Sequence, residues 1–458
     1  METPLWVQLA NLVAAVLFIL TLKGLSHPKT ARRGVMLGAL GAAIATFVVF
    51  FSGIPTDNLI LILVAILIGS AIGLYAARQV AMTQMPQMVA LFNGVGGGAA
   101  ALVSVIEFLE NPESSAIILA ATVFTVVVGS VSFSGSIVTF LKLQELITTR
   151  PVIIPLGKYV TILVAAATVA GAVWLVIAPA TWLLVALLVL ALIFGVLFVL
   201  PVGGADVPIV ISLLNAFTGL SVAAGGYVLG NVLLIVAGTL VGASGTMLTR
   251  LMAEAMGRPL TGTLFGAFSA TASGPAGGVD DRPVRSGTAN DVAIMLGYAN
   301  KVILVPGYGL AVAQAQGTLR ELADTLTEKG IQVDYAIHPV AGRMPGHMNV
   351  LLAEANVPYE QLKEMDEINP EFGEADVALV VGANDVVNPA AKTDTSAPIY
   401  GMPILDVNAA KQVVFLKRSM RPGFAGIQNE LLFDPKTTLL FGDAKDSLGG
   451  VVTSVKEL

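Results

Sequence analysis

The arrangement of hydrophobic and polar positions divides the chain into two parts. In residues 1–262, nine apolar stretches are separated by short polar gaps. A helix needs about 20 consecutive apolar residues to cross the hydrocarbon core of a bilayer. The pattern therefore predicts nine transmembrane helices, over residues 5–25, 34–53, 58–77, 86–108, 115–140, 159–178, 181–200, 207–229 and 231–253.

The second part, residues 288–458, alternates short apolar runs with helical segments. We expect strands at 301–305, 333–337, 377–381, 412–416 and 438–441, a helical run that follows the first strand and ends at Gly330, and a terminal helix to Leu458. Strands that alternate with helices indicate a parallel sheet in a doubly wound, Rossmann-like α/β domain. The predicted fold is thus a membrane all-α bundle followed by such a domain. Residues 263–287, rich in small residues, are expected to be a flexible linker.

Charged residues are scarce and unevenly distributed. They make up 12% of the 458 residues, about half the roughly 25% of soluble proteins. Residues 1–262 carry ten basic side chains, and all of them lie in the gaps after the first, third and fifth stretches, in the last turn of the first or ninth stretch, or behind the ninth. Because basic residues accumulate on the cytoplasmic side of a membrane, we expect the N-terminus outside and residues 288–458 in the cytoplasm.

The overall composition excludes several classes of protein. A chain that is 55% hydrophobic with so little charge is not a disordered protein. The absence of cysteine excludes a disulfide-stapled secreted protein. The excess of 31 acidic over 25 basic residues argues against a nucleic-acid partner.

Candidate nucleotide-binding residues follow three of the predicted strands. Gly307 and Gly309 stand at the first strand-to-helix turn, where glycines let the backbone approach a pyrophosphate; the alternative is an ordinary glycine turn. The second strand ends without the acidic residue that binds the ribose of NAD. The fourth strand ends in Lys417, Arg418 and Ser419, which suit a dianionic phosphate, although a solvated basic pair is the alternative. Together these features favour NADP over NAD.

The third strand is followed by polar residues with two interpretations. Asn384 and Asn388 are of the type that caps turns, so both can be structural. Asp385 is a candidate ionisable group beside the nicotinamide. His338 and His347 lie on loops of the same domain, and we interpret both as structural.

With these segments in hand, the chain resembles the beta subunit family of the proton-translocating NAD(P) transhydrogenases. The resemblance covers nearly the whole length. It is carried by the ordered motifs at 306–315, 337–355, 364–369, 382–391, 417–420 and 441–445, and by the membrane stretch 203–208 with Leu214 and Asn215.

The resemblance implies an enzyme and a partner. Residues 288–458 are then an NADP(H)-binding domain, and one or more alpha subunits carry NAD(H) and further membrane helices. Hydride transfer between NADH and NADP⁺ is coupled to inward proton translocation through residues 1–262. The expected setting is the bacterial inner membrane, with lipid around a homodimer of the complex and no nucleic acid bound.

The resemblance also implies which residues surround NADP(H). They are Gly307, Tyr308, Gly309, Leu310 and Ala311; Val340, Ala341, Gly342, Arg343, Met344, Pro345 and Gly346; Asp366 and Glu367; Gly382, Ala383, Asn384, Asp385, Val386, Val387 and Asn388; Lys417, Arg418 and Ser419; and Gly423, Phe424, Ala425 and Gly426. Arg343 meets the pyrophosphate, the Lys417 group holds the 2′-phosphate, and Asp385, as the catalytic candidate, lies near the nicotinamide ribose. The last four residues form a lid, in which Phe424 replaces a tyrosine and keeps a packing role. No metal site is expected.

Candidates for the proton path are Asn93 and Asn215. Asp206, Arg250 and Arg258 gather at the cytoplasmic membrane edge where the linker begins, so we expect them to couple the path to NADP(H) affinity. Some family members carry a histidine at the position of Asn93, and an amide does not titrate. The proton-carrying group is therefore either an acid near a helix end, with Asp206 best placed before Glu107 or Glu254, or a group on the partner, which we favour. We expect Asn93 and Asn215 to be hydrogen-bonded along a water path; helix–helix contact is the alternative role for both. Four serines at 130, 132, 134 and 136 are expected to serve mostly in packing.

Two other classes remain for the chain. A nucleotide-gated channel or transporter is disfavoured because no filter-like loop interrupts a span and pathway charges are few. A membrane dehydrogenase that reduces quinone is disfavoured because the chain has no cysteine or paired-histidine site for a redox centre.

Overall fold

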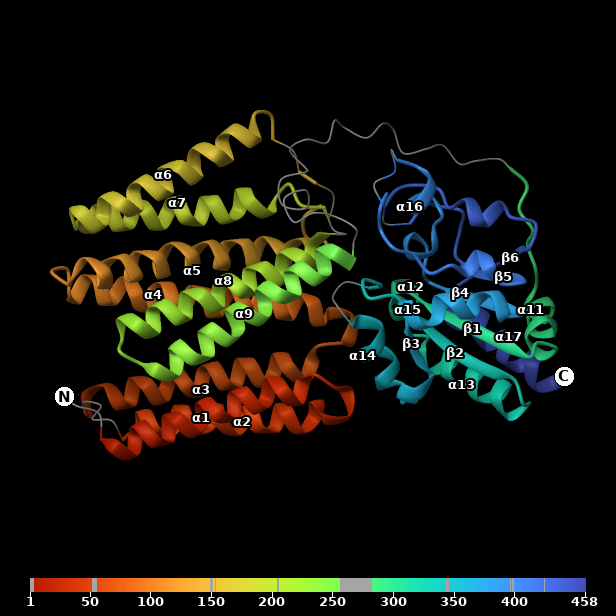
Figure 1. The fold of residues 1–458 in the computed structure, drawn as a ribbon, viewed down its shortest axis with the longest axis horizontal. Helices are drawn as coiled ribbons and strands as arrows, with labels where there is room; N and C mark the ends of the chain where they lie inside the picture. Colours follow the sequence, from red (N-terminus) through yellow and green to blue (C-terminus); the bar gives the residue numbers. More distant parts are fainter. Residues whose placement is uncertain are drawn as a thin grey trace. The chain divides into compact units, whose positions relative to one another are not determined.

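The computed structural model describes residues 4–51, 56–148, 151–152, 154–203, 206–255, 282–342, 346–395, 397, 399–423 and 425–458. Within them, nine helices are long and apolar enough to cross a membrane, and they run alongside one another in Figure 1. They are α1 (Leu5–Leu25), α2 (Pro28–Val49), α3 (Thr56–Gln79), α4 (Met85–Glu110), α5 (Ala116–Leu143), α6 (Gly157–Ile177), α7 (Thr181–Val199), α8 (Val207–Val228) and α9 (Val232–Ala255). The nine predicted spans are confirmed.

Small residues bring the membrane helices together. A Cβ added at Gly97 of α4 would lie 3.0 Å from the Gly129 carbonyl oxygen of α5, and one added at Gly129 would lie 2.6 Å from the Gly97 oxygen. In α1 and α2, a Cβ on Gly24 would lie 2.7 Å from the Gly34 Cα. Helices in lipid associate through such close packing, because the surrounding tails are as apolar as the side chains.

Lys142 shows where a predicted boundary was too early. The sequence places it in the gap after a fifth span ending at residue 140, but α5 continues to Leu143 and Lys142 is fully buried. Its Nζ donates to the carbonyl oxygens of Leu200 (2.5 Å) and Val202 (2.7 Å), just beyond the end of α7. A buried ammonium is expensive without acceptors, and these carbonyls supply them.

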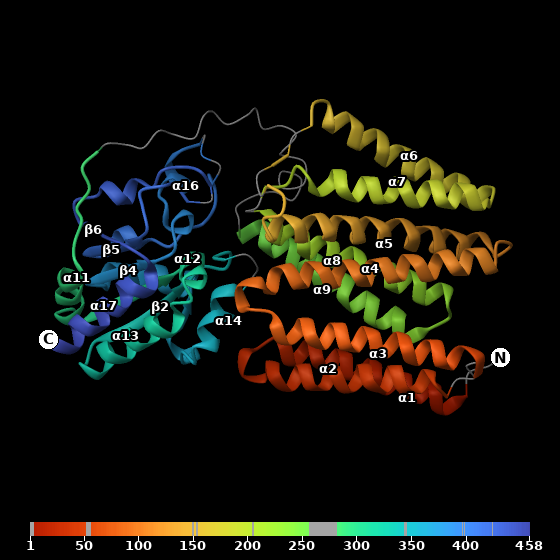
Figure 2. The same cartoon turned by 180° about the vertical axis from the view of Figure 1, so that it is seen from behind.

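The remaining elements form an α/β fold. Six parallel strands make one sheet in the order β3-β2-β1-β4-β5-β6, seen from opposite sides in Figures 1 and 2. The strands are β1 (Lys301–Pro306), β2 (Gln332–Ile337), β3 (Leu362–Glu364), β4 (Val377–Val381), β5 (Gln412–Lys417) and β6 (Thr437–Phe441). The expected Rossmann-like sheet is confirmed, with β3 as a strand that the sequence pattern did not reveal.

Strand residues alternate between two buried faces. Ile303 and Val305 face a core that also holds Phe372 and Phe415, whereas the helices α13 (Gln316–Glu328) and α17 (Ala444–Glu457) cover the opposite face in Figure 1. Helices on both faces explain why the strands are almost entirely apolar. The other helices of the fold are α11 (Ala289–Gly297), α12 (Tyr308–Val312), α14 (His347–Glu354), α15 (Met365–Ile368) and α16 (Ala390–Thr393).

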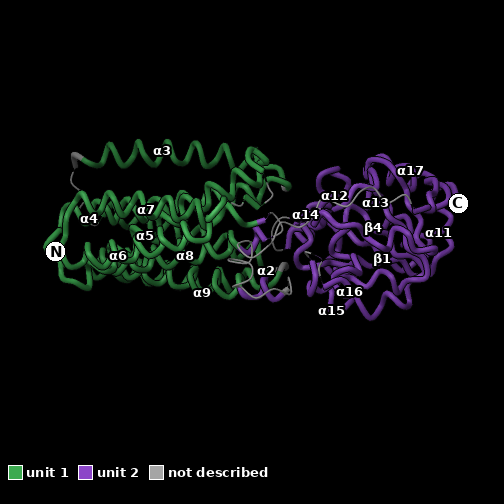
Figure 3. Tube along the Cα trace, turned by 90° about the horizontal axis from the view of Figure 1, so that it is seen from above, with its two compact units in different colours: residues 1–202, 210–249 green, residues 203–209, 250–458 purple. Residues whose placement is uncertain are grey.

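The helical run expected after β1 is interrupted. It consists of α12 and α13, separated at Gln314, which adopts a left-handed φ of 50°. By its internal contacts the chain forms two compact units, residues 1–202 with 210–249 and residues 203–209 with 250–458, coloured separately in Figure 3. Most of the expected linker, residues 263–287, lies outside the described residues, which resume at Arg282.

Candidate functional site

The order of the strands creates a crossover point between β1 and β4. From β1 the chain proceeds to β2 and β3 on one side, and from β4 to β5 and β6 on the other. Loops that leave two neighbouring strands in opposite directions open a crevice at their carboxyl ends, where ligands of such sheets bind. The candidate site is therefore expected beside Pro306 and Val381, the last residues of these strands.

Three glycines let the two loops touch at this point. The amide of Gly307 donates to the Val381 carbonyl (2.9 Å), and that of Gly309 donates to the Gly382 carbonyl (3.0 Å). Gly382 has a φ of +71°, and a Cβ there would lie 2.3 Å from the amide nitrogen of Leu310. Backbone meets backbone, so no side chain fits between the loops. The result is a close contact of two main-chain segments at the carboxyl edge of the sheet.

A cleft of about 590 Å³ opens at this edge. It is lined by residues that follow β1, β4, β5 and β6: Gly309, Val312, Ala313, Gly382, Ala383, Asn384, Leu416, Lys417, Arg418, Ser419, Arg421, Pro422, Gly423, Gly442, Asp443 and Ala444. Its volume is in the range of pockets that hold small molecules and cofactors.

Three cations stand on the β5 side of the cleft. Lys417 is half-buried, and its Nζ donates to Asn384 Oδ1 (3.0 Å) and to the Arg421 carbonyl (3.4 Å). Burial lowers the pKa of Lys417, while the nearby Asp385 carboxylate acts in the opposite direction. Arg418 and Arg421 are exposed. This side of the cleft can bind a phosphate through charge-assisted hydrogen bonds.

A carboxylate secures the loop that follows β5. Asp385 Oδ2 accepts the amide N–H of Ala425 (2.8 Å), and its Oδ1 accepts Nδ2 of Asn384 (3.0 Å). Gly423 packs against the same pair, since a Cβ there would lie 2.4 Å from Asp385 Oδ1. Lys417, Asn384 and Asp385 thus form one polar network that connects the cleft with Arg421, Gly423 and Ala425.

Comparison with known proteins decides the family. The sequence model described as NAD(P) transhydrogenase beta subunit matches residues 7–454. Two relatives from Rhodospirillum rubrum, both named NAD(P) transhydrogenase subunit beta, are each 48% identical over 460 residues, covering 97% of this chain and 98% of their own length. The chain belongs to the NAD(P) transhydrogenase beta subunit family. It is a subunit of an oxidoreductase-type enzyme whose family implies nicotinamide nucleotide binding, and the beta designation implies an alpha subunit.

Eight of the residues predicted for the site line the cleft of this transhydrogenase subunit. They are Gly309, Gly382, Ala383, Asn384, Lys417, Arg418, Ser419 and Gly423. Arg343, Met344, Pro345, Phe424 and the coupling candidate Arg258 lie outside the described residues. The cleft thus collects residues that are more than 100 positions apart in the sequence.

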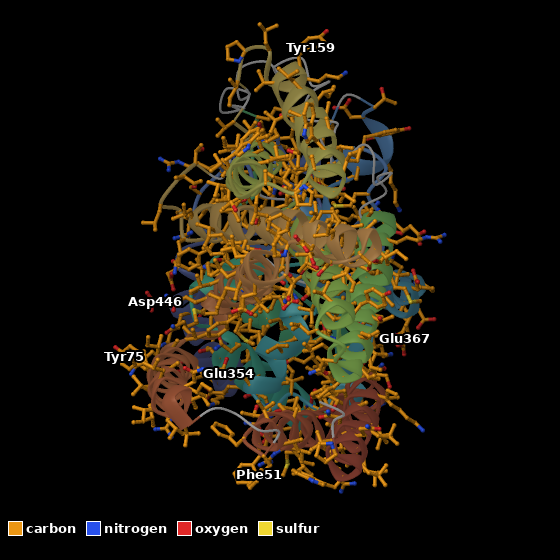
Figure 4. The ribbon with its side chains drawn as sticks, turned by 90° about the vertical axis from the view of Figure 1, so that its left-hand side faces the viewer. Phe51, Tyr75, Tyr159, Glu354, Glu367 and Asp446 are labelled. Carbon is orange, nitrogen blue, oxygen red and sulfur yellow. The ribbon has the colours of Figure 1, made fainter. Side chains whose placement is uncertain are left out.

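The other predicted residues that the structure describes are not part of this lining: Gly307, Tyr308, Leu310, Ala311, Val340, Ala341, Gly342, Gly346, Asp366, Glu367, Asp385, Val386, Val387, Asn388, Ala425 and Gly426. Asp366 and Glu367 are exposed on α15, and Figure 4 places Glu367 at the edge of the view. Asn388 is buried, donates to the Gln428 carbonyl (3.0 Å) and accepts from the Ala390 amide (3.1 Å), which supports its structural alternative.

Sequence analysis missed part of the lining. Arg421 adds a cation two residues beyond the predicted group, and Gly442, Asp443 and Ala444 form the turn from β6 into α17. The signal for this turn was present, because a predicted strand was followed by glycine and the helix-capping Asp443, whose side chain accepts the Lys445 amide.

The two histidines of the α/β fold have structural environments. His338 is 1% exposed; its Nδ1 accepts the Val340 amide (3.2 Å), so its Nε2 carries the proton and donates to the Pro403 carbonyl (2.8 Å). Burial lowers the pKa of His338, against the opposing effect of its hydrogen bond to the Pro403 carbonyl. His347 is also buried, with its ring 5.9 Å from that of Tyr308.

Within the membrane helices, Asn93 joins α4 to α5. Its Nδ2 donates to Ser136 Oγ (2.9 Å) and Ser132 Oγ (3.3 Å), and Ser132 continues to the Leu214 carbonyl (2.9 Å) of α8. Among the described side chains, Asn93 and Asn215 share no direct hydrogen bond, and Asn215 follows Leu214 directly in α8. Two of the four serines therefore do more than pack, because residues four apart share one helix face. Asp206 is half-buried just before α8.

Proposed function

We propose that this chain is the NADP(H)-binding, proton-translocating subunit of a transhydrogenase complex. The cationic cleft at the β1/β4 crossover is the observation that carries the proposal. Its partner is one or more alpha subunits that present NAD(H) and further membrane helices. The complex is expected to be a homodimer in the bacterial inner membrane, with the N-terminus outside and the α/β fold in the cytoplasm.

The cleft fits an extended nucleotide with a 2′-phosphate. Gly309 and Gly382 line the cleft where the two loops touch, and this glycine-rich turn before α12 is proposed to accommodate a pyrophosphate. Lys417, Arg418 and Ser419 stand at the next strand end and suit the additional phosphate. Arg343, which lies outside the described residues, is proposed to complete the pyrophosphate site.

The residues of this chain bind and orient the nucleotide. NADP(H), when bound, supplies the hydride chemistry, and transfer of a hydride needs no acid or base from the protein. Asp385 is a candidate for the nicotinamide end of the site, where it positions the 421–426 loop through the Ala425 amide. The remaining residues of the predicted set, from Tyr308 to Ala311, from Val340 to Gly346, and at Asp366 and Glu367, are proposed to shape the surroundings of the bound nucleotide.

Coupling of hydride transfer to proton translocation drives the reaction toward NADPH. A charge that crosses the membrane is worth ~2.3 kcal/mol per 100 mV. A proton-motive force of about 200 mV then supplies ~4.6 kcal/mol, which corresponds to roughly a thousandfold excess of NADPH at ~1.4 kcal/mol per decade. We propose that protons pass near Asn93 and Asn215, and that Asp206 and Arg258 connect their passage to NADP(H) affinity.

Calorimetric titration of the purified full-length chain tests the nucleotide assignment. NADPH and NADH are titrated into the wild type, into Lys417→Ala/Arg418→Ala, and into Lys329→Ala, an exposed lysine after α13 that serves as the control. We expect a strong preference for NADPH that disappears in the double variant and persists in the control. Equal affinity for both nucleotides, or no binding, contradicts the proposal and favours the alternative of a nucleotide-gated transporter.

A further inference from the structure

Residues 282–287, which we call the strap, are anchored to the α/β fold at three alternate positions. The Arg282 guanidinium forms a bidentate ion pair with Glu430, with N–O distances of 2.8 and 2.9 Å. It also lies over the Phe433 ring, 3.9 Å from its centroid. Val284 packs against the core on one face of the sheet, and Ser286 pairs in parallel with Leu439 of β6.

The geometry of the Arg282 contact is unusually specific for a surface residue. The planar guanidinium fork matches both oxygens of one carboxylate and stacks on an aromatic ring at the same time. Lysine cannot reproduce this arrangement, since its ammonium is a point charge. Arg282, the first described residue of the expected linker, is therefore attached to one place, the 3₁₀ turn η8 (Glu430–Phe433).

A short series of hydrogen bonds leads from this turn to the cleft. Asn429, which is 1% exposed, caps the turn by accepting the Leu431 amide (3.0 Å) and donates to the Asn384 carbonyl (3.1 Å). The Asn384 side chain in turn binds both Lys417 and Asp385. Three steps thus connect Arg282 with the residues that line the cleft.

The second anchor reaches the cleft by another route. The Leu439 amide donates to the Arg285 carbonyl (2.8 Å), and the Gly287 amide donates to the Leu439 carbonyl (2.9 Å). Three residues beyond Leu439 begins the turn of Gly442–Ala444 that lines the cleft from the β6 side. The strap therefore contacts β6, which leads into the cleft lining at Gly442, and η8, which is connected to the lining residue Asn384 through Asn429.

We propose that Arg282 is a positioning residue through which the strap holds η8 and the loop segment that carries Ala425, and thereby sets the rate of NADP(H) release. This inference rests on the proposed function. A displacement of the strap that separates Arg282 from Glu430 loosens η8 and Asn429. Asn384 then loses a fixed position, and the contacts of Lys417 and Asp385 that hold the loop loosen with it.

The test uses the full-length chain assembled with its alpha subunit in membranes. Hydrogen exchange at the Ala425 and Leu431 amides and the rate of NADPH dissociation are measured for the wild type, Arg282→Ala and Arg282→Lys. Because an exposed ion pair and a cation–π contact are each of modest strength, we expect Arg282→Ala to raise both rates about 3–10-fold. Both rates in Arg282→Lys are expected to lie between those of the wild type and Arg282→Ala, because lysine keeps the positive charge but loses the planar guanidinium.

Two controls separate positioning from general destabilisation. Lys456→Ala breaks an equally exposed ion pair with Glu321 (2.6 Å) on the α13–α17 side of the fold, and it should change neither rate. The charge exchange Arg282→Glu/Glu430→Arg should bring both rates back toward those of the wild type, whereas Arg282→Glu alone should behave like the alanine variant.

The outcomes discriminate clearly. Unchanged exchange at Ala425 and Leu431 in Arg282→Ala overturns the inference. Faster exchange with an unchanged rate of NADPH release overturns the positioning role. If the wild-type complex binds no NADPH, the proposed function fails, and the exchange rates alone still decide whether the strap holds the loop.

Discussion

Gly382→Ala tests whether the touching glycine loops form the cleft. The φ of +71° at this position costs an alanine roughly 1–2 kcal/mol. The new Cβ would also lie 2.3 Å from the Leu310 nitrogen and 2.5 Å from the Gly309 Cα, both backbone atoms that cannot rotate away. Overpacking of this kind adds about 1–3 kcal/mol. We therefore expect a destabilisation of ~2–5 kcal/mol and a loss of NADPH affinity of at least about tenfold, since the cleft edge must move.

Gly330→Ala is the matched control. Gly330 has a similar φ of +84°, but a Cβ there meets nothing within 4 Å, so only the conformational cost applies. Hydrogen exchange of the buried β1 and β4 amides gives the free energy of opening of the α/β fold in each variant. Gly382→Ala should be the more destabilised by ~1–3 kcal/mol, and Gly330→Ala should bind NADPH normally. Equal destabilisation of the two variants would refute the close approach of the loops.

Three further predictions concern charge and polar contacts. Asp376 accepts Lys411 Nζ and the Asn300 amide, which hold its pKa at about 2 against an ordinary 3.8. The ionised Asp376 carboxylate therefore stabilises the fold above pH 4, and this stabilisation is lost as the pH falls toward 2. Asp376→Asn should lower the free energy of unfolding by ~1–2 kcal/mol at neutral pH, and stability should then depend less on pH in the acid range. Burial lowers the pKa of Lys417, and a bound phosphate raises it, so NADPH affinity should fall as the pH rises. Titration of NADPH at a series of pH values should show a steeper fall for the wild type than for Lys417→Gln. Asn93→Ala should lower the free energy of unfolding of the helical unit by about 1 kcal/mol, measured by tryptophan fluorescence. A double-mutant cycle with Ser136→Ala should show that the two destabilisations are not additive.

The elements predicted correctly from the sequence are those that the bilayer or the protein core requires to be long or apolar. The membrane spans need a fixed apolar length, so their predicted ends lie within a few residues of the observed ones, apart from α2, which begins six residues earlier at Pro28. The central strands are buried on both faces and read as continuous apolar runs. By contrast, β3 has three residues, Leu-Lys-Glu, on the edge of the sheet, and no pattern of hydrophobicity marks so short and polar a strand.

The sequence predicted which residues of the candidate site follow a strand, but it did not predict the contacts between residues from different elements. Lys417 to Ser419 follow a predicted strand, so their position at the cleft was expected. Gly382 approaches Gly309 because β1 and β4 are neighbours in the sheet. This order of strands is seen only in the folded structure. The bonds from Asn93 to Ser132 and Ser136 depend on the rotation of two helices about their axes, and the anchoring of Arg282 on Glu430 spans 148 residues. Such pairs carry no local sequence signal.

Coupling between nucleotide chemistry and proton movement is best tested in sealed vesicles. The full chain and its alpha subunit are reconstituted with a pH indicator inside, and NADPH and NAD⁺ are added outside. The internal pH should change in step with hydride transfer, and both signals should disappear together in Lys417→Ala/Arg418→Ala. Hydride transfer at the wild-type rate without any change in internal pH, in vesicles that hold an imposed gradient, would contradict the coupling of the two reactions.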